Sequence, residues 1–275
     1  MLLSLAIQTP EVPVRVPIAL LSGSLEEMLA KASGMGYDGV ELISTEPAGV
    51  DRVPVRSMLS ERHLKVSAVA SGGMAFAAKL TLLHPDPAIA ALARKRLDEM
   101  IDLASDLGAA VVTVGSFRGR IVDDPTRSRQ ELAEVLRRAG QRGTQRGVRL
   151  ALEPLNRYEA DLLHTAAETL AFLEEVDHPA VGVLLDTYHL NIEESSWTTP
   201  YSRVLAAGKL FYAHLGDNNR LAPGQGLIDF RSILHTLRQG GYDGWLSAEL
   251  LPMPDPDAAA RLTVNAMRKW MREVQ

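Results

Sequence analysis

Eight apolar, strand-like runs alternate with helical patterns along the 275 residues of this chain. Most of the runs are continuously apolar, which is typical of strands in a parallel sheet that is covered on both faces. No linker or shift in composition divides the chain, and its length suits one large barrel. The sequence therefore predicts an α/β fold with a single domain over residues 1–275, a (β/α)8 TIM barrel.

The expected elements follow one another in regular order. The expected strands are residues 3–8, 39–43, 65–70, 109–115, 148–153, 181–186, 210–215 and 245–249. The expected helices are residues 25–33, 87–107, 126–142, 165–175, 230–239 and 256–274. The second of these helices has the clearest signals, because Asp86 can cap it, Pro87 suits its first position and Gly108 can end it.

A short internal repeat supports the regular layout. The sequence Gly-Tyr-Asp-Gly occurs at 36–39, before the second strand, and again at 241–244, before the eighth, which predicts the same helix-to-strand turn at both places. The main alternative is a doubly wound open sheet, which would carry a glycine-rich phosphate loop after its first strand. Gln-Thr-Pro-Glu follows there instead, at 8–11, so the barrel is favoured.

Composition narrows the class of protein. The net charge of −5 disfavours a nucleic-acid partner, which calls for a basic face. The chain has no cysteine, so it has no disulfide framework, and a reducing, cytoplasmic location is expected. No apolar run approaches the ~20 residues of a membrane span. The apolar N-terminal run at 1–7 has no basic flank, so it is interpreted as a buried strand and not as a signal peptide.

Four acidic or histidine side chains close four successive predicted strands: Glu153, Asp186, His214 and Glu249. They lie about 30 residues apart, the length of one βα unit. The carboxyl ends of barrel strands meet at one face, where active sites lie. Three carboxylates crowded there would repel one another unless a cation lay between them. The spacing therefore predicts a metal site, although each residue taken singly also reads as a solvated acid or a hydrogen-bonded histidine.

The ligand set indicates which cation to expect. Oxygen-rich ligation with one imidazole suits Mn²⁺, Co²⁺ or Mg²⁺ better than a structural Zn²⁺. A catalytic Zn²⁺ is the less favoured alternative. One divalent ion per chain is expected, with Mn²⁺ preferred.

The residues around these ligands carry a family resemblance. The runs Glu-Pro-Leu-Asn-Arg-Tyr-Glu at 153–159 and Asp-Thr-Tyr-His-Leu-Asn-Ile-Glu-Glu at 186–194 are the strongest part of it, with His-Leu-Gly-Asp-Asn-Asn-Arg at 214–220. They resemble the xylose-isomerase-like sugar isomerase/epimerase superfamily, and within it the D-tagatose 3-epimerase and D-psicose 3-epimerase group. The resemblance covers the whole chain in barrel layout and is specific from about residue 153 to 249.

The resemblance implies a role for each matching residue. One divalent metal would be bound by Glu153, Asp186, His214 and Glu249. Glu153 and Glu249 would also be the acid/base pair. The O1 to O3 end of a ketose would be held by Glu159, His189 and Arg220. A homodimer or homotetramer acting on a small-molecule sugar is implied as well.

The residues by themselves agree with this chemistry. Inverting a hydroxyl-bearing carbon beside a ketone needs one base on each face of that carbon and stabilisation of an enediolate. Taken alone, however, His189 reads as a surface-loop histidine, Arg220 as the partner of Asp217 or Glu249, and Glu159 as a surface acid. Arg118 and Arg120 follow the fourth strand and are suited to a sugar phosphate, although a solvated loop is the favoured interpretation there.

The sequence thus predicts a divalent-metal-dependent ketose 3-epimerase, an enzyme of the isomerase class. Three alternatives use the same barrel and the same bases: an aldose–ketose isomerase, a hydroxypyruvate isomerase and a keto-polyol dehydratase. Two readings belong to other classes. An endonuclease IV-like repair enzyme would need further zinc-binding histidines and a basic face, and a non-catalytic sugar-binding protein would need no second glutamate base.

Overall fold

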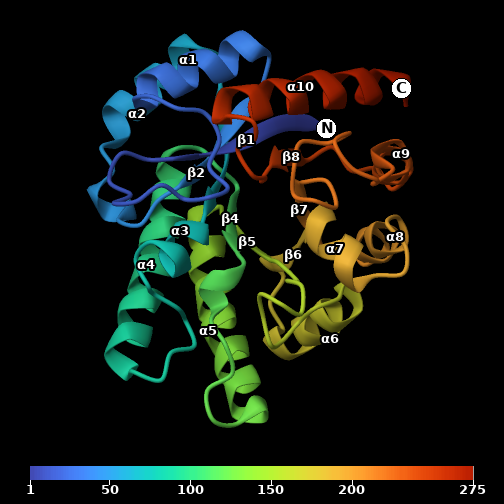
Figure 1. Cartoon of the computed structure of the whole chain (residues 1–275). Coiled ribbons are helices and arrows are strands. Elements are labelled where there is room, and N and C mark those ends of the chain that lie inside the picture. Colours follow the sequence, from blue (N-terminus) through green and yellow to red (C-terminus); the bar gives the residue numbers. More distant parts are fainter. Residues whose placement is uncertain (275) are drawn as a thin grey trace.

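The structure, a computed structural model, describes residues 1–274 and contains a closed parallel barrel (Figure 1). Each strand pairs with its neighbours in the sequence, and β8 returns to pair with β1. The strands are β1 (Leu2–Gln8), β2 (Gly39–Ile43), β3 (Lys65–Ala70), β4 (Val111–Val114), β5 (Arg149–Leu152), β6 (Val181–Asp186), β7 (Leu210–Leu215) and β8 (Trp245–Ala248). The predicted (β/α)8 TIM barrel is confirmed, and every expected strand is present.

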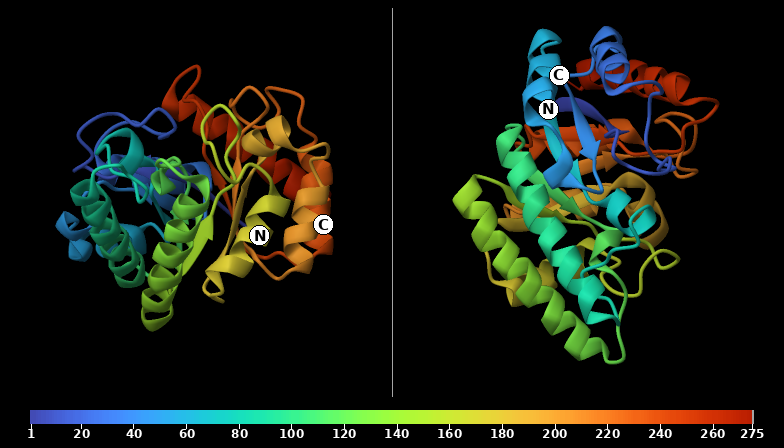
Figure 2. Two further views of the ribbon diagram at one scale, coloured as in Figure 1. Left: turned by 90° about the horizontal axis from the view of Figure 1, so that it is seen from below. Right: turned by 90° about the vertical axis from the view of Figure 1, so that its left-hand side faces the viewer.

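Helices surround the barrel as an outer layer (Figures 1 and 2). The helices are α1 (Leu25–Met35), α2 (Arg52–Glu61), α3 (Gly72–Phe76), α4 (Pro87–Asp106), α5 (Pro125–Arg146), α6 (Ala166–Val176), α7 (Thr187–Glu193), α8 (Thr199–Ala206), α9 (Phe230–Gln239) and α10 (Pro256–Glu273). Short 3-10 turns, η1 (Pro47–Gly49) and η2 (Ser116–Arg118), follow β2 and β4. The layer closes where Lys31 of α1 pairs with Asp257 of α10 at 2.5 Å.

Local signals start α4 where the sequence predicted it, whereas α5 ends at Arg146 and not at the predicted residue 142. The Asp86 side chain accepts a hydrogen bond from the Ala88 N–H and caps α4, with proline in its first turn. The repeated turn is also present, since Gly36 and Gly241 both adopt positive φ, 91° and 74°, before β2 and β8. Glycine adopts this left-handed conformation without the steric penalty that a Cβ would add.

Four helices were not expected from the sequence: α2, α3, α7 and α8. The consequential one is α7, because His189 was expected in a surface loop and instead lies in this helix, buried. The helix begins directly at the end of β6, since Asp186 is both the last strand residue and the N-cap, accepting from the Tyr188 N–H. No turn residues separate strand from helix, so Asp186 is the only local sign of the boundary, and it was assigned to the strand end.

Arg118 corrects another expectation. Its side chain does not face the solvent or a ligand pocket but is fully buried beneath the loops that follow β4 and β5. The guanidinium donates to the backbone carbonyl of Glu153 and to those of Leu162 and Leu163. Arg118 therefore joins the loop after β5 to the turn after β4, which supports the backbone of Glu153.

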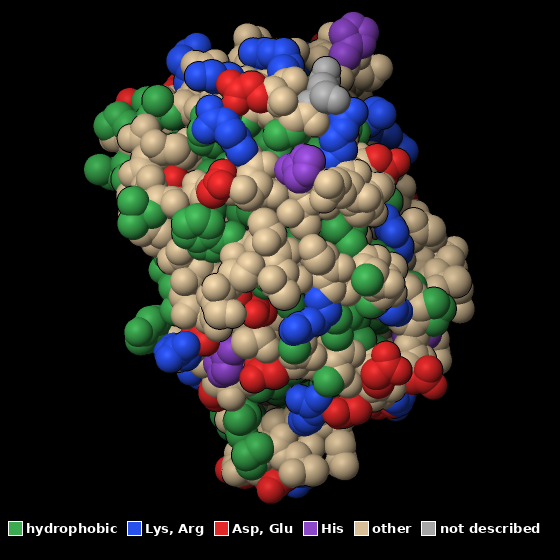
Figure 3. All heavy atoms as spheres, turned by 90° about the vertical axis from the view of Figure 1, so that its right-hand side faces the viewer, with side chains coloured by type: hydrophobic (Ala, Val, Ile, Leu, Met, Phe, Trp, Pro, Cys, Tyr) green, Lys and Arg blue, Asp and Glu red, His purple; other side chains and the backbone are tan. Residues whose placement is uncertain are grey.

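The surface carries charges of both signs. On the face drawn in Figure 3, basic and acidic side chains are interspersed and do not form one basic area. Within residues 1–274, no helix is long and apolar enough to cross a membrane.

Arg118→Met is expected to destabilise the fold, because it removes the donor to the backbone carbonyls of Glu153 and Leu162. An unsatisfied buried polar group costs about 1–3 kcal/mol. The free energy of unfolding, measured by urea denaturation, should therefore fall by at least this amount. Arg120→Met is the matched control, since Arg120 is exposed and surface changes usually stay within about 0.5 kcal/mol. Equal unfolding midpoints for the two variants would contradict the assignment.

Candidate metal centre

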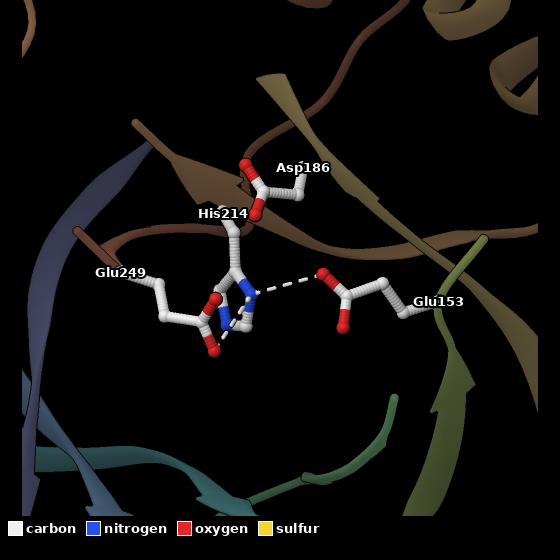
Figure 4. Close-up of side chains that lie close together, drawn as sticks. All are labelled: Glu153, Asp186, His214 and Glu249. Atoms are coloured by element: carbon white, nitrogen blue, oxygen red, sulfur yellow. Dashed lines mark ion pairs between the residues drawn. The ribbon is translucent and has the colours of Figure 1, made fainter. Parts of the chain in front are cut away.

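Four ligand-type side chains meet at the carboxyl ends of four consecutive strands. Asp186 ends β6 and His214 lies in β7, while Glu153 and Glu249 directly follow β5 and β8. Each offers one oxygen or nitrogen atom, and these four atoms lie within 4.8 Å of one another. Figure 4 shows the three carboxylates gathered around the His214 imidazole. The structure thus brings together the four residues that the strand spacing singled out.

The His214 ring is oriented by hydrogen bonding on its far side. Its Nε2 lies 3.0 and 3.1 Å from the two carboxylate oxygens of Glu41, a buried residue in β2. Its Nδ1 lies 3.5 Å from Glu153 Oε1 and 3.7 Å from Glu249 Oε1. Because a carboxylate accepts, the imidazole in its neutral, metal-binding form carries its proton on Nε2 and turns the Nδ1 lone pair toward the other acids.

Glu41 was missed by the sequence analysis. It interrupts the apolar strand Gly39–Ile43 as the one charged residue in it, and its side chain is fully buried. A charge inside a strand that is buried on both faces is rare unless it is paired. A single charged residue within an apolar run was therefore the feature of the sequence that could have identified Glu41.

Unpartnered atoms converge on one point. Glu153 Oε1, Asp186 Oδ2 and His214 Nδ1 are buried and make no hydrogen bond to the described residues. Buried polar side-chain atoms in proteins nearly always have a partner. Three unpartnered acceptors that face one another are the arrangement that a bound cation would satisfy, and oxygen ligands with one imidazole suit a divalent ion. The donor set therefore fits the expected metal.

Proton affinities at the centre are raised when no cation is considered. Burial, and then the charges of Glu153 and Glu249, raise the pKa of Asp186 to about 8. Burial also raises the pKa of Glu153. For His214, burial lowers the pKa, but the carboxylates of Glu41 and Glu249 outweigh it and the pKa is raised overall. Protons therefore compete with a cation for these ligands.

The absence of a side chain at Gly115 makes room for the Glu153 carboxylate. A Cβ atom at Gly115, just after β4, would lie 2.4 Å from Glu153 Oε2, well inside van der Waals contact. Glycine at this position therefore allows the Glu153 carboxylate to approach its neighbours.

The three residues expected to hold a sugar border the same centre. Arg220 Nη2 lies 3.0 Å from Glu249 Oε2, and its Nη1 lies 3.1 Å from Glu159 Oε1. The guanidinium also stacks on the Tyr188 ring at 4.6 Å. His189 Nε2 lies 3.8 Å from Asp186 Oδ2. Arg220 thus pairs with Glu249 and Glu159, and its salt bridges do not involve Asp217.

His189 is held as a neutral hydrogen-bond donor. Its Nδ1 lies 3.3 Å from the Asn156 N–H and 2.8 Å from the Asn156 side-chain amide, both of which donate to it. Nδ1 is therefore the acceptor and Nε2 carries the proton. Burial, followed by the charge of Arg220, lowers the pKa of His189 well below its usual value. Its Nε2–H points toward Glu153 and Asp186.

A buried aspartate shapes the loop that carries Arg220. The Asp217 carboxylate accepts hydrogen bonds from four backbone N–H groups of its own loop, those of Asn218, Gly224, Gly226 and Ile228. Within this loop Arg220 has a φ of 59°, a left-handed conformation that is uncommon outside glycine. This arrangement was not predicted from the sequence, because backbone donors carry no residue identity.

A cavity of about 220 Å³ opens above the centre. One side of it consists of the acidic, histidine and arginine side chains already described. The other side comes from β4 and from the segments after β1, β3 and β4: Val16, Pro17, Ile18, Ser71, Gly72, Phe76, Thr113, Gly115 and Ser116. The site is thus charged toward β5–β8, whereas the described residues that line it toward β1–β4 are uncharged.

Fold and site together define a class. Residues 29–273 match the family described as "Xylose isomerase-like TIM barrel", and the chain belongs to this family. An L-ribulose 3-epimerase of Methylomonas sp. (strain DH-1) is 35% identical over 228 residues, covering 80% of this chain and 76% of that protein. A ketose 3-epimerase of Arthrobacter globiformis is 32% identical over 217 residues, covering 78% of this chain and 73% of that protein.

Solved structures agree with these relatives. The structure of an L-ribulose 3-epimerase superposes with a TM-score of 0.81 at 28% identity, covering 98% of this chain and 95% of that one. The predicted relationship to xylose-isomerase-like sugar isomerases and epimerases is confirmed. The predicted enzyme class, isomerase, is confirmed as well, because the relatives are epimerases.

The raised proton affinities predict how a metal stabilises the protein. The ordinary pKa of Asp186 is 3.8 and its folded pKa is about 8, so the metal-free fold holds extra protons and loses stability as pH rises through this range. A cation binds the deprotonated ligands and reverses this loss of stability. The rise in melting temperature on replacing EDTA with Mn²⁺ should therefore be larger at pH 8 than at pH 6.

Asp186→Asn serves as the control, since it removes one ligand and should show little rise at either pH. A rise of the same size at both pH values in the unaltered protein would contradict competition between protons and metal at this centre.

Proposed function

We propose that this protein is a divalent-metal-dependent ketose 3-epimerase. The observation that carries the proposal is the placement of two buried glutamates on different strands. Glu153 and Glu249 approach the His214 ring from opposite sides (Figure 4). Inverting a carbon requires removing its proton on one face and returning a proton on the other. A sugar held between these carboxylates would have a proton acceptor on one side and a proton donor on the other.

The ion would be held by Glu153, Asp186, His214 and Glu249, with Mn²⁺ as the preferred metal. When bound, such an ion supplies a fixed positive charge that stabilises negative charge on two neighbouring sugar oxygens. Its affinity for oxygen and imidazole donors matches the unpartnered atoms of the site. The same donors would also accept Co²⁺ or Mg²⁺, and the metal content of the purified protein decides among them.

The glutamates differ in what they contact. Glu249 accepts a hydrogen bond from the Arg220 guanidinium. Burial raises the pKa of Glu153. One of the two groups would remove a proton from the sugar and the other would return one, and the two roles exchange when the reaction runs backward.

The bordering residues orient the sugar. The Nε2–H of His189 and the guanidinium of Arg220 are donors that face the cavity, and both would bind oxygens that become negative during proton removal. Glu159 holds Arg220 from its other side. We assign these three residues to the end of the sugar that carries the ketone.

The names of the relatives favour C3 over C1 as the carbon of the sugar that loses and regains a proton. Two of the relatives described above are named for 3-epimerisation, one of L-ribulose and one of ketoses in general. Among the described residues that line the cavity, Arg220 is the one lysine or arginine, and it is already paired with two glutamates. An unphosphorylated ketopentose or ketohexose therefore suits the site.

Exchange of the C3 proton with solvent is the expected signature. The Mn²⁺-loaded enzyme, incubated in D₂O with L-ribulose, D-fructose, D-psicose and D-tagatose, should introduce deuterium at C3 and form the C3 epimer, and NMR would identify the labelled carbon. Label at C1 or C2 with an aldose product would establish an isomerase instead. Deuterium uptake accompanied by loss of water from the sugar would establish a dehydratase.

Glu153→Gln and Glu249→Gln should each lower epimerisation by about 10²–10⁴-fold, the usual contribution of a general acid or base. Glu174→Gln, at an exposed position on α6, is the matched control and should leave turnover unchanged. Normal turnover in either of the first two variants would contradict the assigned pair.

A further inference from the structure

A fully buried carboxylate lies outside the proposed ligand set. Glu41, in β2, faces across the barrel to His214 in β7, and none of its surface is exposed. No lysine or arginine in residues 1–274 forms an ion pair with it. An isolated buried carboxylate is strongly unfavourable unless hydrogen bonds or opposite charge compensate it. The bond to His214 is therefore the principal interaction that accounts for Glu41.

A group of hydroxyls fixes Glu41 from the interior of the barrel. The Tyr212 hydroxyl lies 3.4 Å from Glu41 Oε2 and donates to it. The same hydroxyl lies 2.6 Å from Ser67 Oγ and 3.3 Å from Ser4 Oγ, so side chains from β1 and β3 hold it in place. The Tyr212 ring also packs edge-on against His214, with ring centroids 5.6 Å apart. The Glu41 carboxylate thus has one fixed orientation, toward Nε2.

The consequence lies at the opposite ring nitrogen. With Nε2 committed to Glu41, only Nδ1 has a free lone pair, and Nδ1 is the atom that faces Glu153 and Glu249. A carboxylate behind a ligating histidine fixes the ring and its tautomer and increases the donor strength of the other nitrogen. Loss of such a partner typically lowers metal affinity by about 10–100-fold.

We propose that Glu41 is a positioning residue of the metal centre, acting on the bound cation through His214 and held in place by Tyr212. This inference rests on the metal dependence in the proposed function. It concerns metal affinity, which is measured without any sugar.

Calorimetric titration with Mn²⁺ alone tests the proposal. The unaltered protein should bind about one ion per chain, and Glu41→Gln should bind about 10–100-fold more weakly. Tyr212→Phe keeps the carboxylate but removes one of its hydrogen bonds, so its affinity should fall by a smaller factor. Thermal melting in EDTA checks that each variant is folded. Turnover of Glu41→Gln should recover at saturating Mn²⁺, which a general defect of the fold would not permit.

The outcomes separate the two claims. No Mn²⁺ binding by the unaltered protein would overturn the metal dependence itself. Binding by the unaltered protein with equal affinity in a folded Glu41→Gln would overturn the role of Glu41 alone.

A measurement on the unaltered protein decides the matter even if Glu41→Gln does not fold. In ¹⁵N-labelled, Mg²⁺-loaded protein, the proton of His214 should be found on Nε2, as a downfield, hydrogen-bonded resonance. A proton on Nδ1 would place the ion on the other nitrogen and would overturn the proposal.

Discussion

Mutual repulsion among three buried carboxylates is the constraint on which the rest of this site depends. Glu153, Asp186 and Glu249 are brought together by the closure of the barrel, since each lies at or just after the end of its strand. Burial, and then the charge of Glu249, raise the pKa of Glu153, and burial with the charges of Glu153 and Glu249 raises the pKa of Asp186. A divalent ion together with Arg220 would balance these negative charges. The three carboxylates would therefore be favourable in their charged form only when the ion is bound.

Much of the surrounding structure holds Arg220 and His189 in place. Arg220 is set by an unusual backbone conformation that the Asp217 carboxylate supports through four N–H groups, and His189 is set by two donors from Asn156. These supporting contacts are hydrogen bonds with defined directions, whereas the described residues that line the cavity toward β1–β4 are uncharged. Rigid placement of charged groups is the principal way in which a site can stabilise developing charge without reorganising.

The sequence predicted the barrel and the four converging residues because both follow from periodicity. Buried strands are apolar runs, and an acid at the end of each run is conspicuous. The helix α7 was missed because Asp186 ends the strand and caps the helix at once, so His189 was placed in a loop. Glu41, Asn156 and Asp217 were missed for a related reason. They act on a ring orientation or on backbone donors, and such partners are defined only by the folded chain.

The proposed ligands lie at or near the carboxyl ends of β5–β8, while the facing wall of the cavity comes from β4 and from segments that follow β1, β3 and β4. This division allows the two halves of the barrel to be altered separately. Substitutions at Val16, Ile18 or Phe76 can reshape the space offered to the far end of a substrate while leaving the proposed ligands untouched. Glu41 and Gly115 are the exceptions in this half, since Glu41 contacts His214 and a Cβ at Gly115 would clash with Glu153. New specificities should therefore arise most readily in this half, provided that those two positions are left unchanged.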